Sequence, residues 1–553
     1  MRSAINSSDG PLILDISDLS VSLGSRRDSL RIIEDLSLQV RQGETLCLVG
    51  ESGSGKSVAS LTIMGLLPKR TLVPAAGRIR LAGEDLLGAT QRRLRQLRAT
   101  TMAMIFQEPM SALNPVLTVG RQIDEVLRAH SQLDARARRR RILDMMEQVY
   151  LPDVERIFAS YPHRLSGGQR QRIMIAMALI LKPKLLIADE PTTALDVTTQ
   201  KQILALIREL QEKQGAAVLF ITHDMGVVAE IADRVAVMRR GKLVETGALS
   251  QILAEPERDY TRKLLAAVPS LAPRAARPAA RTPIVLETID LEKVYRERSM
   301  LRAGREVVAA EKITLTLRKG RTLGVVGESG SGKSTVARCI MRLIDPTSGS
   351  IRVVGSEISF LSRRMLQPHR KRIQMIFQDP YRSLNPRVTV GETIAEGPVN
   401  FGAPRAEALA RARELLELVD LSGDAATRYP HQFSGGQRQR IAIARALAMD
   451  PDILVADEAV SALDVSVQAQ VLKLLDDIQS RLGVALLFVT HDLRVAAQIC
   501  DDVIVMQRGR IIEQGPAGEV LTNPQQTYTR QLIEAAPGRN WDFANFRPAV
   551  TVP

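Results

Sequence analysis

Two glycine-rich segments, each ending in a lysine and a serine, are the residues best suited to chemistry in this sequence. GESGSGKS stands at residues 50–57 and again at 327–334, each time directly after a short apolar run typical of a buried strand. In this G-x-x-x-x-G-K-S pattern the glycines let backbone N–H groups converge on phosphate oxygens, at a helix N-terminus that favours anions. The lysine reaches the β- and γ-phosphates, and the serine ligates Mg²⁺. The residues predicted to bind the nucleotide in this way are Gly50, Ser52, Gly53, Gly55, Lys56, Ser57 and Val58, and Gly327, Ser329, Gly330, Gly332, Lys333, Ser334 and Thr335.

Acidic residues follow a second apolar run in each half. One run ends in Asp189 and Glu190, the other in Asp457 and Glu458. The aspartate is predicted to hold Mg²⁺ through water. The glutamate that follows is predicted to orient and polarise the attacking water. Phosphoryl transfer needs mainly positioning and charge neutralisation, and these residues supply both.

Every one of these motifs occurs twice, in the same order. The repeated strings are FQ at 106–107 and 377–378, SGGQRQR at 166–172 and 434–440, ADE at 188–190 and 456–458, and THD at 222–224 and 490–492. This pattern indicates a tandem duplication, with each half long enough to bury its own core. A stretch rich in Ala, Pro and Arg without hydrophobic period separates the halves. We therefore expect a first domain at 1–268, a linker at 269–283 and a second domain at 284–553.

Strand-like and helical patterns alternate within each half. Short, wholly apolar strands separated by helices predict an α/β fold whose parallel sheet is covered on both faces. The stretch 107–166 is charged and helical, and is expected to form a separate lobe.

Composition limits the class of protein. The chain carries 75 Lys and Arg against 61 Asp and Glu, a net charge of +14. A basic balance suits nucleic acid, an anionic membrane surface or nucleotide phosphates, but aromatic residues for base stacking make up only 3%. No apolar run approaches the roughly 18 residues of a membrane span, and no signal-peptide core is present, so we expect a soluble intracellular chain. Three cysteines without CxxC spacing predict neither an iron–sulfur cluster nor a zinc site.

The string SGGQ ahead of the Asp-Glu strand makes both halves resemble the ATP-binding cassette (ABC) ATPases. The match is LSGGQ at 165–169 and FSGGQ at 433–437, and it extends over nearly the whole chain. The resemblance implies tandem P-loop ABC ATPase domains, each with a mainly parallel sheet and flanking helices, an N-terminal antiparallel β part and a helical subdomain. In that family two cassettes dimerise head to tail, and each ATP lies between the phosphate loop of one and the signature of the other.

The resemblance also assigns roles to residues. The catalytic residues are Glu190, Glu458, His223, His491, Gln107 and Gln378. The Mg²⁺ ligands are Ser57, Gln107, Asp189, Ser334, Gln378 and Asp457. The signature residues that bind ATP from the other cassette are Ser166, Gly167, Gly168 and Gln169, and Ser434, Gly435, Gly436 and Gln437. Neither half has lost its glutamate, histidine or signature glycine, so two hydrolytically competent sites are expected.

The two halves differ at the expected adenine contact. The family often stacks an aromatic side chain on adenine upstream of the phosphate loop, and Tyr295 fits that place in the second half. Leu23 stands in the corresponding run of the first half, which puts adenine stacking there in question.

Three further details resemble the oligopeptide, dipeptide and nickel import ATPases, with two such ATPases fused as in some glutathione and peptide importers. These are EPMSALNP at 108–115 and DPYRSLNP at 379–386, YPH at 161–163 and 429–431, and a late Pro–Tyr–Thr–Leu segment (Pro256, Tyr260, Thr261 and Leu264; Pro524, Tyr528, Thr529 and Leu532). The resemblance implies two transmembrane permease subunits as partners, contacted by the helical lobes 111–165 and 383–433, and indirectly an extracytoplasmic solute-binding protein. It implies a peripheral location on the cytoplasmic face of the inner membrane. The solute stays open between peptide, glutathione, nickel and opine-like cargo.

A ribosome-associated tandem ABC ATPase is the alternative. Such proteins are also soluble, basic and built of two cassettes, but usually carry a long charged helical linker. The linker here is short and rich in proline, which favours the importer and leaves no nucleic-acid partner expected.

Overall fold

The computed structural model describes residues 10–24, 29–68, 71–192, 195–275, 277, 282–296, 306–461 and 463–549. Its contacts divide the chain into two compact units. The first unit contains Met1–Val268 and Pro537–Pro553, and the second contains Pro269–Ala536. The C-terminal residues from Pro537 onward therefore cluster with the first unit, although they follow the second in sequence.

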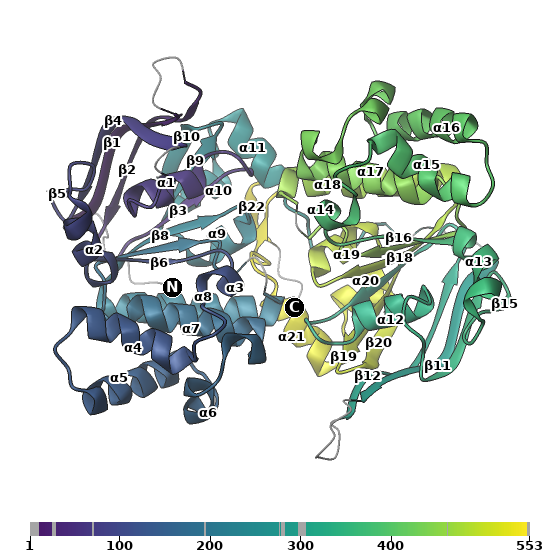
Figure 1. Cartoon of the computed structure of the whole chain (residues 1–553), viewed down its shortest axis with the longest axis horizontal. Helices are drawn as coiled ribbons and strands as arrows, with labels where there is room; N and C mark the ends of the chain where they lie inside the picture. Colours follow the sequence, from purple (N-terminus) through teal and green to yellow (C-terminus); the bar gives the residue numbers. More distant parts are fainter. Residues whose placement is uncertain are drawn as a thin grey trace. The chain divides into compact units, whose positions relative to one another are not determined.

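A six-stranded, mainly parallel sheet forms the centre of each unit (Figure 1). The strand order is β10-β9-β3-β8-β7-β6 in the first unit and β16-β17-β18-β13-β19-β20 in the second. Only the pairs β9–β10 and β19–β20 are antiparallel. The strands are β3 (Thr45–Val49), β6 (Met102–Ile105), β7 (Leu185–Asp189), β8 (Ala217–Thr222), β9 (Arg234–Arg239) and β10 (Lys242–Ala248), then β13 (Thr322–Val326), β16 (Ile373–Ile376), β17 (Ile453–Asp457), β18 (Ala485–Thr490), β19 (Asp502–Gln507) and β20 (Arg510–Pro516).

The central strands are wholly buried, as the apolar runs predict for a sheet covered on both faces. Every residue of β3, β7 and β8 is buried, and the same holds for β13, β17 and β18. Parallel strands share one carboxyl edge, so the loops that leave these strands meet on one side of the sheet. The predicted α/β fold with a mainly parallel sheet is confirmed.

Each unit also contains a four-stranded antiparallel sheet, two of whose strands come before and two after the first strand of the central sheet, and this confirms the antiparallel β part. The strand orders are β2-β1-β4-β5 and β12-β11-β14-β15. Its apolar face shares one core with the central sheet and with the helix that follows the glycine-rich loop. The strands are β1 (Leu12–Leu23), β2 (Arg31–Arg41), β4 (Leu72–Leu81) and β5 (Glu84–Asp85), then β11 (Ile284–Arg296), β12 (Glu306–Arg318), β14 (Ser348–Val353) and β15 (Ser356–Glu357).

Helices cover the central sheets, and one group forms the predicted helical lobe. In the first unit α4, α5 and α6 pack on one another, and α4 and α5 also pack on α7; in the second unit α15 and α16 pack on α17. The helices are α1 (Lys56–Ile63), α2 (Gln91–Thr100), α3 (Pro109–Ala112), α4 (Val119–His130), α5 (Ala135–Gln148), α6 (Val154–Phe158), α7 (Gly167–Leu179), α8 (Val197–Gln214), α9 (Met225–Ile231), α10 (Leu249–Ala254) and α11 (Asp259–Ala266), then α12 (Lys333–Ile340), α13 (Arg363–Arg372), α14 (Pro380–Ser383), α15 (Val390–Asn400), α16 (Arg405–Leu418), α17 (Gly435–Leu447), α18 (Val465–Leu482), α19 (Leu493–Ile499), α20 (Ala517–Thr522) and α21 (Thr527–Ala535). Across the described residues, none of the helices is both long and apolar enough to span a bilayer.

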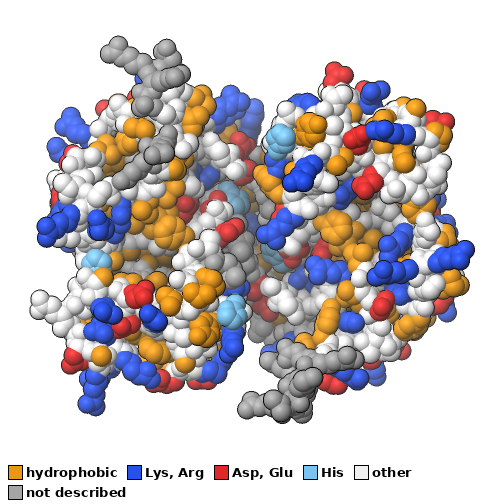
Figure 2. Space-filling model, in the orientation of Figure 1, with side chains coloured by type: hydrophobic (Ala, Val, Ile, Leu, Met, Phe, Trp, Pro, Cys, Tyr) orange, Lys and Arg blue, Asp and Glu red, His pale blue; other side chains and the backbone are white. Residues whose placement is uncertain are grey.

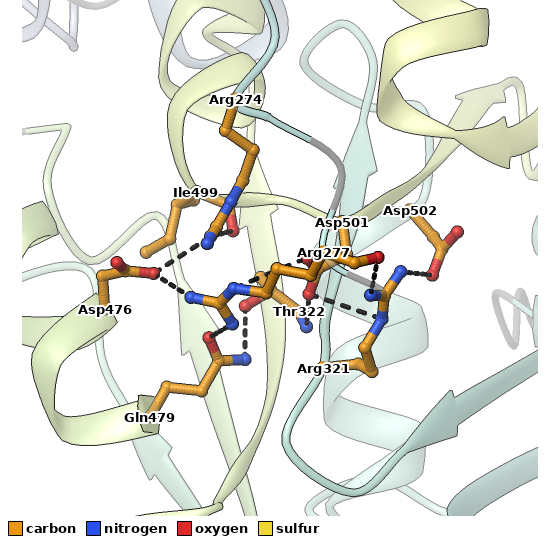
Figure 3. A network of polar contacts seen from close by, with 9 residues as sticks. All are labelled: Arg274, Arg277, Arg321, Thr322, Asp476, Gln479, Ile499, Asp501 and Asp502. Atoms are coloured by element: carbon orange, nitrogen blue, oxygen red, sulfur yellow. Dashed lines mark hydrogen bonds and ion pairs between the residues drawn. The ribbon is translucent and has the colours of Figure 1, made fainter. Parts of the chain in front are cut away.

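Two arginines attach the beginning of the segment 269–283 to the second unit (Figure 3). Arg274 donates to the carboxylate of Asp476 and to the backbone carbonyl of Ile499, both at 3.0 Å. Arg277 donates to the same carboxylate and to the Gln479 side chain. The described part of this segment therefore lies against α18 and the end of α19.

The same polar network contains a buried aspartate, Asp501, whose side chain is 1% exposed. It accepts a hydrogen bond of 2.8 Å from the backbone N–H of Thr322 and lies 3.6 Å from Arg321 and 3.9 Å from Arg277. Replacing it with alanine leaves a buried N–H and two arginines without this acceptor. We expect Asp501→Ala to destabilise the second unit by about 3 kcal/mol.

The measurement for Asp501→Ala is the denaturant midpoint of the full chain, with hydrogen exchange of the β13 amides locating the change. The matched control is Asp477→Ala. Asp477 is exposed on α18, the helix that carries Asp476 of this network. This substitution is expected to shift the free energy of unfolding by no more than about 0.5 kcal/mol. Equal midpoints for both variants contradict the structural role given to Asp501.

Candidate nucleotide-binding sites

The glycine-rich loop joins β3 to α1 in the first unit (Figure 1) and β13 to α12 in the second. Its first glycine has a positive φ in both copies, 151° at Gly50 and 148° at Gly327. A Cβ atom at either place would lie 2.2 Å from a backbone oxygen of the neighbouring strand, that of Met238 or Met506. Only glycine lets the loop pass this close to the sheet.

The predicted phosphate-binding lysine lies buried inside this loop. Lys56 Nζ donates to the backbone oxygens of Gly50 and Glu51 at 2.7 and 2.9 Å. Lys333 makes the same pair of contacts in the second unit, at 2.7 and 2.8 Å. Neutral loop oxygens thus hold each buried ammonium group at the centre of the loop, where the phosphates of a nucleotide require positive charge.

A serine hydroxyl and an aspartate carboxylate meet beside each loop. Ser57 Oγ donates to Asp189 at 3.3 Å, and Ser334 Oγ donates to Asp457 at 2.8 Å. Burial raises the pKa of both aspartates, with the neighbouring glutamate adding to the effect. The first unit adds Ser60, which donates to Asp189 at 3.3 Å and which the motif analysis missed. Its only signal is its spacing of one helical turn from Ser57.

These hydroxyl and carboxylate oxygens are hard donors of the kind that Mg²⁺ takes when nucleotide phosphates complete its coordination. Among the residues that the structure describes, no three or more His, Cys, Asp or Glu side chains are grouped to hold a metal ion by themselves. The pair Ser57 and Asp189, and its copy Ser334 and Asp457, therefore fits a metal that arrives with a nucleotide.

Three predicted catalytic residues converge in each unit. Glu190 accepts from Gln107 Nε2 at 2.9 Å and lies 3.0 Å from His223 Nδ1. In the second unit Glu458 accepts from Gln378 Nε2 at 2.8 Å and lies 3.4 Å from His491 Nδ1.

The backbone of both glutamates is strained. Glu190 has a φ of 46° and Glu458 a φ of 48°, in the left-handed region that side-chain-bearing residues rarely adopt. Such strain concentrates at functional sites, where the surrounding structure holds it in place.

The Glu458–His491 pair has coupled pKa shifts. Burial acts to raise the pKa of Glu458, but the hydrogen bond and charge of His491 outweigh it and hold that pKa below its usual value. Burial acts to lower the pKa of His491, but the hydrogen bond and charge of Glu458 outweigh it and raise that pKa. The glutamate's contribution to stability is present above its unfolded pKa and lost as pH falls through its lower folded pKa. The histidine's contribution is present below its unfolded pKa and lost as pH rises through its higher folded pKa. Both are complete between about pH 4.5 and 6.5.

We therefore expect His491→Gln to destabilise the chain more at pH 6 than at pH 9. The extra drop in the unfolding midpoint at pH 6 is expected to be about 2–4 °C. The measurement is thermal unfolding without nucleotide at both pH values, with His130→Gln, at an exposed position, as the control. A drop of the same size at both pH values contradicts the ionised pair.

The signature residues begin α7 and α17. Ser166 Oγ accepts from the backbone N–H of Gln169 at 3.2 Å, and the Gln169 side chain accepts from the backbone N–H of Ser166 at 3.1 Å. Ser434 and Gln437 repeat this reciprocal cap. The cap fixes an N-terminus whose N–H groups suit an anion. Besides the helix N-terminus at the phosphate loop, each unit thus has a capped one at the signature.

Strand register identifies Leu23 as the counterpart of Tyr295. Asp18 in β1 and Asp290 in β11 both have a positive φ, of 51° and 47°, and stand at equivalent places in the two strands. Leu23 and Tyr295 stand at the same distance beyond these aspartates, and their side chains are 46% and 44% exposed. Lys293 Nζ lies 5.1 Å from the centre of the Tyr295 ring. An exposed aromatic platform is therefore available at the second position, and an aliphatic side chain at the first.

Comparison with known proteins finds family matches in both halves of the chain. Residues 33–193 and 310–461 match the ABC transporter family, and residues 244–302 and 512–544 match the oligopeptide/dipeptide transporter C-terminal region. A peptidoglycan transport ATP-binding protein of Agrobacterium fabrum is 47% identical over 528 residues, covering 95% of this chain and 96% of its own. A glutathione import ATP-binding protein of Escherichia coli K12 is 47% identical over 564 residues, covering 96% and 90%. A solved ATP-binding cassette with bound ADP and phosphate is 29% identical, with a TM-score of 0.38, covering 42% of this chain and 98% of its own.

Proposed function

This chain belongs to the ABC transporter family, as a tandem ATP-binding protein of the oligopeptide/dipeptide transporter type, and on that premise we propose that it hydrolyses ATP to drive import of a peptide-like solute. The observation that carries the proposal is the duplicated cluster of glutamine, glutamate and histidine next to a phosphate loop. The solute class rests on the C-terminal region and on relatives named for glutathione import and peptidoglycan transport.

The roles proposed for the residues follow from their contacts. The buried Lys56 and Lys333 neutralise the charge of the nucleotide phosphates. Glu190 and Glu458 orient the attacking water and accept its proton, while their glutamine and histidine partners hold the carboxylates in place. Mg²⁺, held by the serine–aspartate pairs and Gln107 or Gln378, supplies further charge neutralisation when bound.

We further propose that the cassettes, 1–268 and 284–553, work as a head-to-tail pair joined by the linker 269–283. The signature 434–437 then completes the site of Lys56 and Glu190, and the signature 166–169 completes that of Lys333 and Glu458. The two capped helix N-termini support this pairing, because each offers N–H donors to a γ-phosphate. ATP binding then draws the cassettes together and hydrolysis releases them.

The helical lobes, 111–165 and 383–433, are the proposed contact with two transmembrane permease subunits. In the second unit a cavity of about 400 Å³ opens among α14, α15, α16 and α17, lined in part by Asn385, Glu396 and Arg405. Gln378, which bonds Glu458, lies just before α14. The cavity therefore adjoins the segment that leads from the catalytic cluster. The proposed location is the cytoplasmic face of the inner membrane, with an extracytoplasmic binding protein acting only through the permeases.

A ribosome-associated ATPase is the competing function. A nucleic-acid-binding surface gathers basic side chains into a patch or stripe. Figure 2 shows Lys and Arg dispersed among acidic and neutral side chains over the visible face of each unit. In the linker, Arg274 and Arg277 are bound to the second unit. Both observations favour the importer.

The test of the proposed function is a pull-down of the tagged Glu190→Gln/Glu458→Gln chain from membranes in the presence of Mg·ATP. Two multi-span permease subunits in the bound fraction support the importer, and transport of labelled peptides into vesicles then defines the solute. Ribosomal proteins and RNA without permeases overturn the importer in favour of the competing function.

A further inference from the structure

The Pro–Tyr–Thr–Leu segment has no part in the proposed catalytic cycle, yet its tyrosine reaches the phosphate loop in both units. The tyrosines lie near the start of α11 and α21. The backbone N–H of Glu51 donates to Tyr260 Oη at 3.4 Å. The backbone N–H of Glu328 donates to Tyr528 Oη at 3.3 Å. The contact thus occurs twice, between segments far apart in the sequence.

The residue held by the tyrosine is also one that holds the phosphate-binding lysine. The backbone oxygen of Glu51 accepts from Lys56 Nζ at 2.9 Å, and that of Glu328 accepts from Lys333 Nζ at 2.8 Å. Each glutamate is therefore held through its N–H by a tyrosine and through its carbonyl by the lysine. A shift of the tyrosine therefore moves the glutamate backbone whose oxygen accepts the hydrogen bond from the lysine.

The helix that carries the first tyrosine is fixed to the central sheet. Glu245 of β10 is buried and accepts hydrogen bonds from the backbone N–H groups of Glu257 and Arg258, at 2.8 and 3.2 Å, and from the Thr261 hydroxyl. Leu264 is buried behind it. In the second unit Glu513 of β20 repeats the two backbone contacts with Gln525 and Gln526. The tyrosine is thus presented from a fixed support.

The first tyrosine offers a neutral phenol oxygen to the Glu51 N–H. Burial raises the pKa of Tyr260, so its hydroxyl stays neutral at physiological pH. The Arg239 guanidinium carbon lies 4.7 Å from the ring centre and holds the ring in place. The corresponding residue of the second half is Gln507, so this extra contact belongs to the first unit.

We propose that Tyr260 and Tyr528 are positioning residues, which hold the phosphate loops through Glu51 and Glu328 and so tie nucleotide affinity to the C-terminal extension of each cassette. The inference rests on the proposed function, since it takes these loops to bind ATP.

The experiment compares the full chain with Tyr260→Phe/Tyr528→Phe, which removes two hydroxyls and keeps both rings. Binding of a fluorescent ATP analogue with Mg²⁺ is expected to weaken about fivefold, the effect of one net hydrogen bond per site. KM for ATP is expected to rise by the same factor, with kcat at saturating ATP within about twofold and the nucleotide-free unfolding midpoint unchanged. The control is Tyr150→Phe, which removes an exposed hydroxyl bonded to Glu209.

A matched pair of threonine variants tests the support. Thr261 bonds Glu245, whereas the buried hydroxyl of its counterpart Thr529 has no hydrogen-bond partner within the described part of the chain. In a Lys333→Ala background, where only the first loop binds, Thr261→Val is expected to weaken nucleotide binding. In a Lys56→Ala background Thr529→Val is expected to leave it unchanged.

The outcomes separate the two proposals. Normal nucleotide affinity in Tyr260→Phe/Tyr528→Phe, with a wild-type chain that binds ATP, overturns the positioning role alone. A lowered nucleotide-free midpoint with unchanged KM also overturns it, because the tyrosines then serve only stability. Two outcomes overturn the proposed function and the inference together. In the first, the wild-type chain binds no ATP. In the second, the variant Lys56→Ala/Lys333→Ala binds ATP as tightly as the wild-type chain.

Discussion

Steady-state ATP hydrolysis is expected to fall by about 10²–10⁴-fold when Glu190 and Glu458 are both replaced with glutamine, the range that loss of a positioned general base produces. Glutamine keeps the size of the side chain and its acceptor oxygen, so the contact with Gln107 or Gln378 is retained. It has no basic oxygen to take a proton from water. ATP is therefore expected to stay bound while turnover stops. The measurements are phosphate release at saturating Mg·ATP and the nucleotide retained after gel filtration.

The single variants show whether both sites hydrolyse. Because each unit has its own complete cluster, Glu190→Gln leaves Glu458 able to act and Glu458→Gln leaves Glu190. A suitable control is Glu108→Gln, an exposed carboxylate next to Gln107 in the chain. Unchanged turnover in both singles and in the double variant contradicts the catalytic assignment. Loss in the control contradicts a specific role for the glutamates.

The hydrophobic pattern was enough to predict the parallel sheet, and the motif was enough to predict the strand and the helix on either side of each glycine-rich loop. A phosphate loop requires a buried strand before it and a helix after it, and these stand at β3 and α1 and at β13 and α12. The clustering of Gln107, Glu190 and His223 followed from the resemblance to a family, not from spacing. Their separation along the chain gives no local signal that they touch.

Backbone geometry and long-range contacts could not be predicted from the sequence. Nothing in ADE predicts a positive φ at Glu190, since acidic residues after a strand commonly lie in ordinary turns. The contact between Glu51 and Tyr260 joins residues 209 positions apart, and no periodicity reports such a pair. The counterpart of Tyr295 could be settled only by strand register, because spacing between the halves drifts in that region.

The linker shows a different limit. Its Ala, Pro and Arg composition predicted an extended segment, but composition does not tell where an arginine finds an acceptor. Arg274 and Arg277 find Asp476 on α18, on the side of that helix next to the end of α19. Predicting this contact requires the packing of the second unit, not the sequence of the linker.

The head-to-tail pairing predicts a crossed pattern of lost activity. In a Glu190→Gln background only the second site turns over, and the pairing completes that site with the signature of the first half. Gly167→Asp is then expected to lower the remaining turnover about 10²-fold or more, because a carboxylate faces the γ-phosphate where N–H donors are needed. Gly435→Asp in the same background is expected to leave turnover at least about tenfold higher than Gly167→Asp does. In a Glu458→Gln background the two aspartate variants are expected to exchange their effects.

The crossed pattern is informative because both substitutions fit the fold. The closest side-chain atom to a Cβ at Gly167 lies 4.0 Å away on Leu195, and the closest to a Cβ at Gly435 lie 3.9 Å away on Leu463 and Tyr381. Aspartate in the first turn of a helix interacts favourably with the helix dipole, so α7 and α17 are expected to keep their stability. Unfolding midpoints without nucleotide verify this. If each cassette instead uses its own signature, Gly435→Asp is the damaging change in the Glu190→Gln background. Equal losses from both substitutions in both backgrounds contradict the pairing. The pairing requires the more damaging substitution to change when the active site changes.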